Sequence, residues 1–234
     1  MASQLLTIGG GGYYGPEGGP NRMMLYFLSL TGKKHPRVCL IPTATADRAE
    51  SILTFVQCYN HIAAHPDYLS LYHVPCRDIE TWLNDFDAVY ISGGNTRNLL
   101  ALWKAWDLDQ MLIRFMKSGR IVAGESAGAN CWFETSNSDY IPSEYNPHPG
   151  LGLLKGSVCP HYADKNGRRA SFLNMVKTGA APAGYGISDR AALHFIDGQL
   201  NEALIEWPDA GVYKVERTAD GEVSETKLDA RIVP

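Results

Sequence analysis

Short apolar runs recur along the first half of the chain, and each is followed by glycine, proline or asparagine and then by apolar positions at helical spacing. Aliphatic and β-branched runs bounded by turn residues are typical of strands buried in a parallel sheet. The pattern predicts strands at 5–8, 38–41, 69–74, 88–91 and 121–123. Between and after them it predicts helices at 23–30, 49–63, 99–103, 108–116 and 127–133.

This alternation of strands and helices predicts an α/β fold with an open, mostly parallel sheet and helices on both faces. After residue 183 the pattern changes to strand-like segments at 185–188, 191–195, 203–207 and 212–216, with Asp-Gly turn signals at 197–198 and 220–221. We expect these segments to form a C-terminal antiparallel extension that completes the sheet. Because no linker-like stretch or charge run divides the 234 residues, we expect a single domain over 1–234.

The charge pattern narrows the range of ligands that the chain is expected to bind. The net charge is −4 and the signs are interspersed, so the chain lacks the basic stripe that nucleic-acid binding requires. Small molecules or short peptides are the expected ligands.

The cysteines and the absence of long apolar runs indicate the cellular compartment in which we expect the protein. The cysteines are scattered, odd in number and without C-x-x-C spacing, which favours buried thiols in a reducing cytoplasm over a disulfide framework or a zinc cluster. The N-terminal stretch lacks a basic region, and no apolar run reaches the roughly 18 residues needed to span a membrane. We therefore expect a cytoplasmic protein without a membrane partner.

The most informative chemical motif is Gly124-Glu125-Ser126-Ala127-Gly128, which directly follows a predicted strand and precedes a predicted helix. Small residues on both sides of a serine permit the sharp strand-to-helix turn that exposes a nucleophilic hydroxyl. Ser126 is therefore the candidate nucleophile. The alternative is that the glycines only make a tight turn and that Ser126 caps the helix.

The glycine-rich segment 9–19 also contains a G-x-G-x-x-G match, from Gly10 to Gly15, after the first predicted strand. That match is the dinucleotide-binding fingerprint, but prolines and further glycines keep the chain irregular until about Asn21, and no acidic residue ends the second strand. We expect a loop that borders the active site, and no cofactor.

A second glycine-containing turn, Gly93-Gly94-Asn95-Thr96, follows the strand at 88–91. The backbone N–H of Gly93 or Gly94, together with that of Ala127, could form an oxyanion hole, and Asn95 is a candidate substrate-binding residue. The alternative is an ordinary turn in which Asn95 or Thr96 caps a helix, and both interpretations can hold together.

His161 follows a short predicted strand at 157–158 and is the candidate general base. Two residues are candidates for the acid that orients it. Asp189 stands at a predicted strand end, which positions a carboxylate more rigidly than the loop that holds Asp139. Either could instead be a solvated turn aspartate.

Arginines downstream of His161 are candidates for binding a substrate carboxylate, which a guanidinium can grip through two hydrogen bonds. Each of them alone is more often a surface charge. The candidates are Arg168, Arg169 and Arg190.

Three of these landmarks, 93–96, 126–130 and 160–161, occur in an order that resembles the peptidase E family of serine peptidases, which also includes cyanophycinases. The order Ser, His, Asp argues against an ordinary α/β-hydrolase, whose acid precedes the histidine. The resemblance implies a fold like that of class I glutamine amidotransferases, with Ser126 in place of a cysteine nucleophile. It also implies a Ser-His-acid peptidase without metal or cofactor. It leaves the oligomeric state open, with a homodimer as one option.

By the resemblance, Ser126 matches the family nucleophile, His161 its base, Asp189 a position that is often Glu or Asp, and Asp139 an aspartate also proposed as the acid. Two features depart from the family. Glu125 stands where peptidase E has an aromatic residue. The stretch from His161 to Arg168-Arg169 is also shorter than in aspartyl dipeptidases, which recognise the substrate aspartate through basic residues near it.

The resulting expectation is a serine exopeptidase for short peptides, with a dipeptidase for N-terminal Asp as the leading choice. The alternatives are a broad or carboxypeptidase-like peptidase of the same family, a cyanophycinase-like hydrolase, and a non-catalytic amidotransferase-like binding domain.

Overall fold

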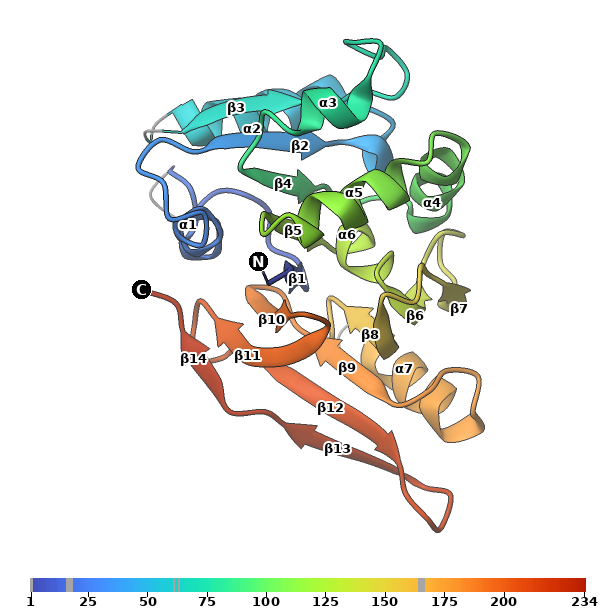
Figure 1. Cartoon of the computed structure of the whole chain (residues 1–234). Helices are drawn as coiled ribbons and strands as arrows, with labels where there is room; N and C mark the ends of the chain where they lie inside the picture. Colours follow the sequence, from blue (N-terminus) through green and yellow to red (C-terminus); the bar gives the residue numbers. More distant parts are fainter. Residues whose placement is uncertain (1, 16–18, 61, 63, 164–166) are drawn as a thin grey trace.

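The computed structural model describes the whole chain except residues 1, 16–18, 61, 63 and 164–166. Its central feature is an eight-stranded sheet with helices packed against it (Figure 1). In spatial order the strands of this first sheet are β14 (Ala230–Ile232), β11 (Gln199–Ile205), β10 (Ala191–Ile196), β1 (Gln4–Ile8), β5 (Ile121–Glu125), β4 (Ala88–Ile91), β2 (Arg37–Ile41) and β3 (His65–Tyr68).

The first sheet is parallel from β1 through β5, β4 and β2 to β3, and β10 joins its other side antiparallel to β1. A hairpin then adds β11, with Asp197 and Gly198 at its turn, and both have positive φ values (49° and 75°). An Asp-Gly pair suits such a turn because both central residues take left-handed backbone angles. The predicted mostly parallel sheet with an antiparallel extension is confirmed in this part of the chain.

A second, six-stranded sheet lies beside the first, and its strands are labelled β6 to β9, β12 and β13 in Figure 1. Its strands are, in spatial order, β13 (Val223–Lys227), β12 (Val212–Arg217), β9 (Gly184–Ile187), β8 (Leu154–Pro160), β6 (Phe133–Ser138) and β7 (Asn146–Pro149). The prediction that the segments at 185–188 and 212–216 extend the first sheet is wrong, because β9 and β12 pair within this second sheet. Periodicity identifies strands but not their pairing partners.

Helices cover both faces of the first sheet. Successive strand side chains point to opposite faces, so Leu5 packs in one core and Leu6 in the other. Buried side chains of α1 (Arg22–Ser29) and α2 (Ala49–Asn60) fill the core around Leu6. The core around Leu5 is filled from α3 (Ile79–Leu83), α4 (Thr96–Ala105), α5 (Leu108–Lys117) and α6 (Ala127–Asn130).

The remaining helix, α7 (Arg168–Thr178), packs with the second sheet in a small core of its own around Phe172. No helix among the described residues is long and apolar enough to cross a membrane. All cysteines are free thiols, and those other than Cys76 are buried.

Two predicted elements have different limits in the structure. The run 69–74 is not a strand: β3 lies just before it as an exposed edge strand. Leu69 and Leu71 are buried, and Leu69 N still donates to Leu40 O of β2 at 2.9 Å. The helix predicted at 127–133 ends at Asn130, because the chain turns there into β6. The predicted helix at 49–63 is observed to Asn60, and residues 61 and 63 lie outside the described part.

Candidate active site

Ser126 occupies a sharp turn between β5 and α6, with φ 52° and ψ −106°. Residues other than glycine rarely adopt such angles, and they persist only where the surroundings enforce them. The flanking glycines permit the close packing, since a Cβ on Gly124 would lie 2.1 Å from the Gly128 oxygen and one on Gly128 would lie 2.6 Å from the Ile91 oxygen. The Ser126 side chain makes no capping hydrogen bond to α6, so the capping alternative is not realised.

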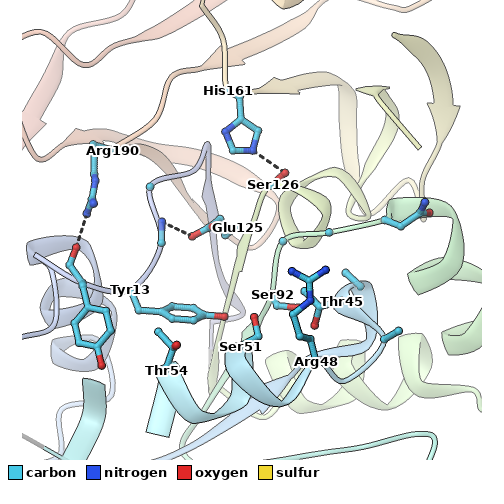
Figure 2. Close-up of a pocket in the computed structure, with 18 residues that line it drawn as sticks. Tyr13, Thr45, Arg48, Ser51, Thr54, Ser92, Glu125, Ser126, His161 and Arg190 are labelled. Atoms are coloured by element: carbon cyan, nitrogen blue, oxygen red, sulfur yellow. Dashed lines mark hydrogen bonds between the residues drawn. The ribbon is translucent and has the colours of Figure 1, made fainter. Parts of the chain in front are cut away.

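A hydrogen-bond chain links Ser126 to a histidine and an aspartate. His161 Nε2 lies 2.9 Å from Ser126 Oγ (Figure 2), and His161 Nδ1 lies 2.6 Å from Asp189 Oδ1. A carboxylate at Nδ1 favours the imidazole tautomer whose Nε2 can accept a proton from the serine hydroxyl. The arrangement is therefore suited to general-base activation of Ser126.

Asp139, the other candidate acid, lies in a different environment. Its Oδ2 is 2.6 Å from Arg168 Nη2, and the Arg168 side chain is buried. Among the described residues, the carboxylate that hydrogen-bonds His161 is that of Asp189.

The end of β1 holds the three segments of this site together. Three successive carbonyls accept backbone amides from them: Ile8 O from Ser126 N (3.0 Å), Gly9 O from His161 N (3.2 Å) and Gly10 O from Arg190 N (2.9 Å). A Cβ on Gly10 would lie 2.3 Å from Asp189 Oδ1 and 2.4 Å from His161 Cε1. The expectation that the glycine-rich segment borders the active site therefore agrees with the geometry, while residues 16–18 of that segment lie outside the described part.

Of the two glycines after β4, Gly93 lies close to the nucleophile and Gly94 packs against Ala44. A Cβ on Gly93 would lie 3.3 Å from Ser126 Cβ, and one on Gly94 would lie 2.2 Å from the Ala44 oxygen. In the part of the chain that the structure describes, no acceptor is found for the N–H groups of Gly93, Gly94 or Ala127. Amides placed beside the nucleophile in this way can bind a developing oxyanion.

Asn95 caps the following helix, which is one of the two interpretations that the sequence left open. Its Oδ1 accepts from Asn98 N at 3.0 Å and caps α4, and its Nδ2 donates to Tyr140 O at 3.2 Å. Asn95 also lines the pocket in front of Ser126.

That pocket has a volume of about 810 Å³, within the range of small-ligand sites. Its walls come from the segments 11–14 and 44–46, from the turn 93–95 and from α2, and Ser126 and His161 lie at its edge (Figure 2).

The predicted carboxylate-binding arginines have other partners. Arg190 lines the pocket, and its Nη1 donates to Tyr14 O at 3.1 Å and lies 3.2 Å from Glu206 Oε2. Arg168 pairs with Asp139, and Arg169 pairs with Glu225. The structure does not bring Arg168 or Arg169 to the pocket wall.

Two charged pocket residues were absent from the sequence-based list of site residues. Arg48 is exposed on the pocket wall, and no carboxylate among the described residues pairs with it. Nothing in the sequence near Arg48 indicated this position. The sequence does draw attention to Glu125, because peptidase E has an aromatic residue at that position.

Glu125 is half-buried beside the nucleophile. Its Oε2 accepts from Gly12 N and from the Tyr90 hydroxyl, each at 3.1 Å. Burial raises the pKa of the Glu125 carboxyl above its ordinary value, and the charge of Asp189 adds to this, while His161 and the two hydrogen bonds act in the opposite direction.

Comparisons with known proteins place this geometry in context. The model of peptidase family S51 matches residues 5–203. The chain is 36% identical over 230 residues to the uncharacterized peptidase YgaJ of Bacillus subtilis (strain 168), covering 97% of this chain and 98% of that protein. The uncharacterized peptidase PM1590 of Pasteurella multocida (strain Pm70) is 27% identical over 151 residues, which cover 59% of this chain and 71% of that protein.

Two solved structures have the same fold at low sequence identity. The crystal structure of a peptidase from an acI-B1 Actinobacterium superposes with a TM-score of 0.68 at 19% identity, covering 98% of this chain and 95% of that one. The crystal structure of a putative peptidase E protein from Listeria monocytogenes gives a TM-score of 0.62 at 17% identity, covering 98% and 100%. The predicted fold class is thereby confirmed.

Proposed function

This chain belongs to peptidase family S51, a family of serine-type peptidases, and from that premise we propose that it is an exopeptidase for short peptides that uses Ser126, His161 and Asp189 as nucleophile, base and acid. The observation that carries the proposal is the unbroken hydrogen-bond chain from Ser126 Oγ through the His161 ring to Asp189. Family membership accounts for peptidase chemistry, and the geometry supports the assignment of roles.

In the proposed reaction, His161 Nε2 takes the proton of Ser126 as Oγ attacks the scissile carbonyl carbon. The carbonyl oxygen becomes an oxyanion, which the N–H groups of Ala127 and of Gly93 or Gly94 stabilise. His161 then gives its proton to the leaving amine as the C–N bond breaks. Water, deprotonated by the same imidazole, hydrolyses the acyl-serine and restores the hydroxyl.

We further propose a dipeptidase, with N-terminal Asp as the leading choice of substrate residue. The bounded pocket supports a short substrate, and the arginines on its wall, Arg48 and Arg190, support the binding of a substrate carboxylate. Of these two, Arg48 is the better candidate because Arg190 already pairs with Glu206.

Two measurements test this function together. A fluorophosphonate probe should label Ser126 in the wild type and should not label Ser126→Ala. A kinetic screen should then compare Asp-X, X-Asp and neutral dipeptides with N-blocked peptides and with an Asp-Arg polymer. Hydrolysis of blocked peptides from the carboxyl end, or of the polymer, would replace the dipeptidase proposal with the corresponding activity, and a protein that is neither labelled nor active would be a binding domain.

A further inference from the structure

Glu125 presents one oxygen to the protein and the other to the pocket. The two hydrogen bonds from Gly12 N and the Tyr90 hydroxyl both reach Oε2. For Oε1, no donor is found among the described residues. A Cβ built on Gly93, which lines the pocket, would lie 3.5 Å from that oxygen. Glu125 itself lines the pocket, so a carboxylate oxygen with open lone pairs is available at the wall of the space where a substrate would bind.

The position of a Cβ built on Gly93 also shows that Glu125 lies close to the nucleophile. A Cβ there would lie 3.3 Å from Ser126 Cβ and 3.5 Å from Glu125 Oε1, and both Ser126 and Glu125 line the pocket. In Figure 2, Glu125 lies near Ser126, with its hydrogen bond to the glycine-rich loop drawn as a dashed line. A group bound at Oε1 would be close to the carbon that Ser126 attacks.

No arginine or lysine in the described part of the chain balances the charge of this carboxylate. Among the described residues, no lysine or arginine forms an ion pair with Glu125, and the two arginines of the pocket wall are Arg48 and Arg190, of which the second pairs with Glu206. A partly desolvated carboxylate without a cationic partner is unfavourable, and a cation brought by a ligand would relieve that cost. The charge of the site therefore favours a positively charged group on the substrate.

We propose that Glu125 Oε1 binds the α-ammonium group of the substrate's N-terminal residue, which restricts cleavage to the first peptide bond of peptides with a free amino terminus. The α-ammonium is attached to the carbon next to the scissile carbonyl, so its acceptor must lie beside the nucleophile, as Glu125 does. The cation of a lysine or arginine side chain would stand several bonds further away. This inference rests on the proposed function and assigns Glu125 as a specificity-determining residue in it.

The experiment uses substrates that differ only in the α-amino group. Succinyl-Leu is Asp-Leu without that group, and propionyl-Leu is Ala-Leu without it. For the wild type we expect a kcat/KM about 100-fold higher for the free-amine member of each pair, in keeping with a charge-assisted hydrogen bond in a partly desolvated site. Glu125→Gln keeps the size of the side chain and one acceptor oxygen for Gly12 and Tyr90, but it replaces the other oxygen with an NH2 donor and removes the charge. It should narrow that ratio by about tenfold or more.

Tyr90→Phe is the matched control, because it removes a hydrogen bond to Oε2 while leaving the carboxylate charge in place. Its free-amine preference should stay within about threefold of the wild type, since one neutral hydrogen bond contributes little to discrimination. If Glu125→Gln fails to fold, Glu125→Asp retains the charge with a shorter reach, and it should keep part of the preference.

Equal hydrolysis of the paired substrates by the wild type would overturn the inference, as would an unchanged preference in Glu125→Gln or a preference abolished in Glu125→Asp. These failures are distinct from a failure of the proposed function. If only the inference about Glu125 fails, Ser126 still reacts with the fluorophosphonate and dipeptides are still cleaved. If Ser126→Ala is active, the serine mechanism itself is refuted, whatever the preference for a free amine.

Discussion

His161 and Asp189 meet because each follows a strand end at the same level of the second sheet. Pro160, the last residue of β8, is in register with Ile187, the last residue of its parallel neighbour β9. The His161 Nδ1 to Asp189 Oδ1 distance is 2.6 Å. Ser126 follows β5 of the first sheet, so the hydrogen-bond chain crosses from one sheet to the other, and its geometry depends on how the end of β1 joins them.

We expect Asp189→Asn to reduce kcat far more than Asp139→Asn. An amide beside His161 Nδ1 favours the wrong imidazole tautomer, an effect of about ten-thousand-fold in Ser-His-Asp proteases. Steady-state kinetics of the two variants on one dipeptide measure the ranking. The reverse ranking would assign the orienting role to Asp139.

Asp139→Asn should instead lower stability. The change removes the Asp139 carboxylate from the buried Arg168 guanidinium, which the Asn137 carbonyl and the Tyr145 ring also contact. We expect a loss of about 1–3 kcal/mol, measured as a lower midpoint of thermal unfolding. A wild-type midpoint together with a large loss of kcat would contradict this structural role.

The sequence predicted Ser126, His161 and Asp189 as nucleophile, base and acid, with Asp139 as the alternative acid. Functional groups collect at the carboxyl ends of parallel strands, and all three residues follow strand ends. The pattern showed only residues 157–158 of β8 and did not show that β8 and β9 are parallel. The partners of Arg168 and Arg169 could not be predicted, since Asp139 and Glu225 reach them only through the pairing of the second sheet. Local spacing carries no information on such long-range contacts.

Glu125 and Arg48 illustrate a second limit. Arg48 follows Ala46 and Asp47, which both have left-handed backbone angles. Neither is glycine, the residue from which such a turn is usually predicted. The role proposed for Glu125 depends on which of its two carboxylate oxygens accepts hydrogen bonds from the protein, and the sequence does not show that.

Gly10→Ala should impair catalysis through displacement of the base and the acid. The added Cβ would lie 2.3 Å from Asp189 Oδ1 and 2.4 Å from His161 Cε1, so both side chains must move. A misplacement of about 1 Å can cost about 100-fold in rate, and we expect a loss of that order in kcat. Gly19→Ala is the matched control, because a Cβ there meets no atom of the described residues within 4 Å. Equal activities of the two variants would show that the site tolerates the displacement.

Arg48→Ala tests which arginine holds a substrate carboxylate. If Arg48 binds the Asp side chain, its removal should lower kcat/KM for Asp-Leu by on the order of tenfold and leave Asn-Leu nearly unchanged, because the lost ion pair weakens only the charged substrate. Arg168→Ala and Arg169→Ala should leave the Asp-over-Asn ratio as it is, since neither side chain lines the pocket. A ratio that falls in Arg169→Ala and not in Arg48→Ala would return the role to the arginine pair expected from the sequence.

The same Glu125→Gln variant should be more stable than the wild type at neutral and higher pH. Burial raises the pKa of the Glu125 carboxyl above its ordinary value of 4.5, so the folded state holds this proton more tightly than the unfolded chain does. Below the ordinary pKa both states are protonated and the group has no linked cost. As the pH rises, the unfolded chain ionises first, and the folded state loses stability until the pH passes the raised pKa.

Glutamine does not ionise, whereas the neighbouring titratable groups, His161, Asp189, Tyr90 and Tyr13, are the same in both proteins. The midpoint of thermal unfolding of Glu125→Gln should therefore exceed that of the wild type at about pH 8, and the difference should shrink towards about pH 4. A lower midpoint for the variant at about pH 8 would mean that the hydrogen bonds from Gly12 and Tyr90 need a charged acceptor. The carboxylate would then stabilise the glycine-rich loop, and its charge would not be a cost that a substrate cation relieves. A gain in stability together with a loss of free-amine preference is the combination expected of a charge retained for binding at the expense of stability.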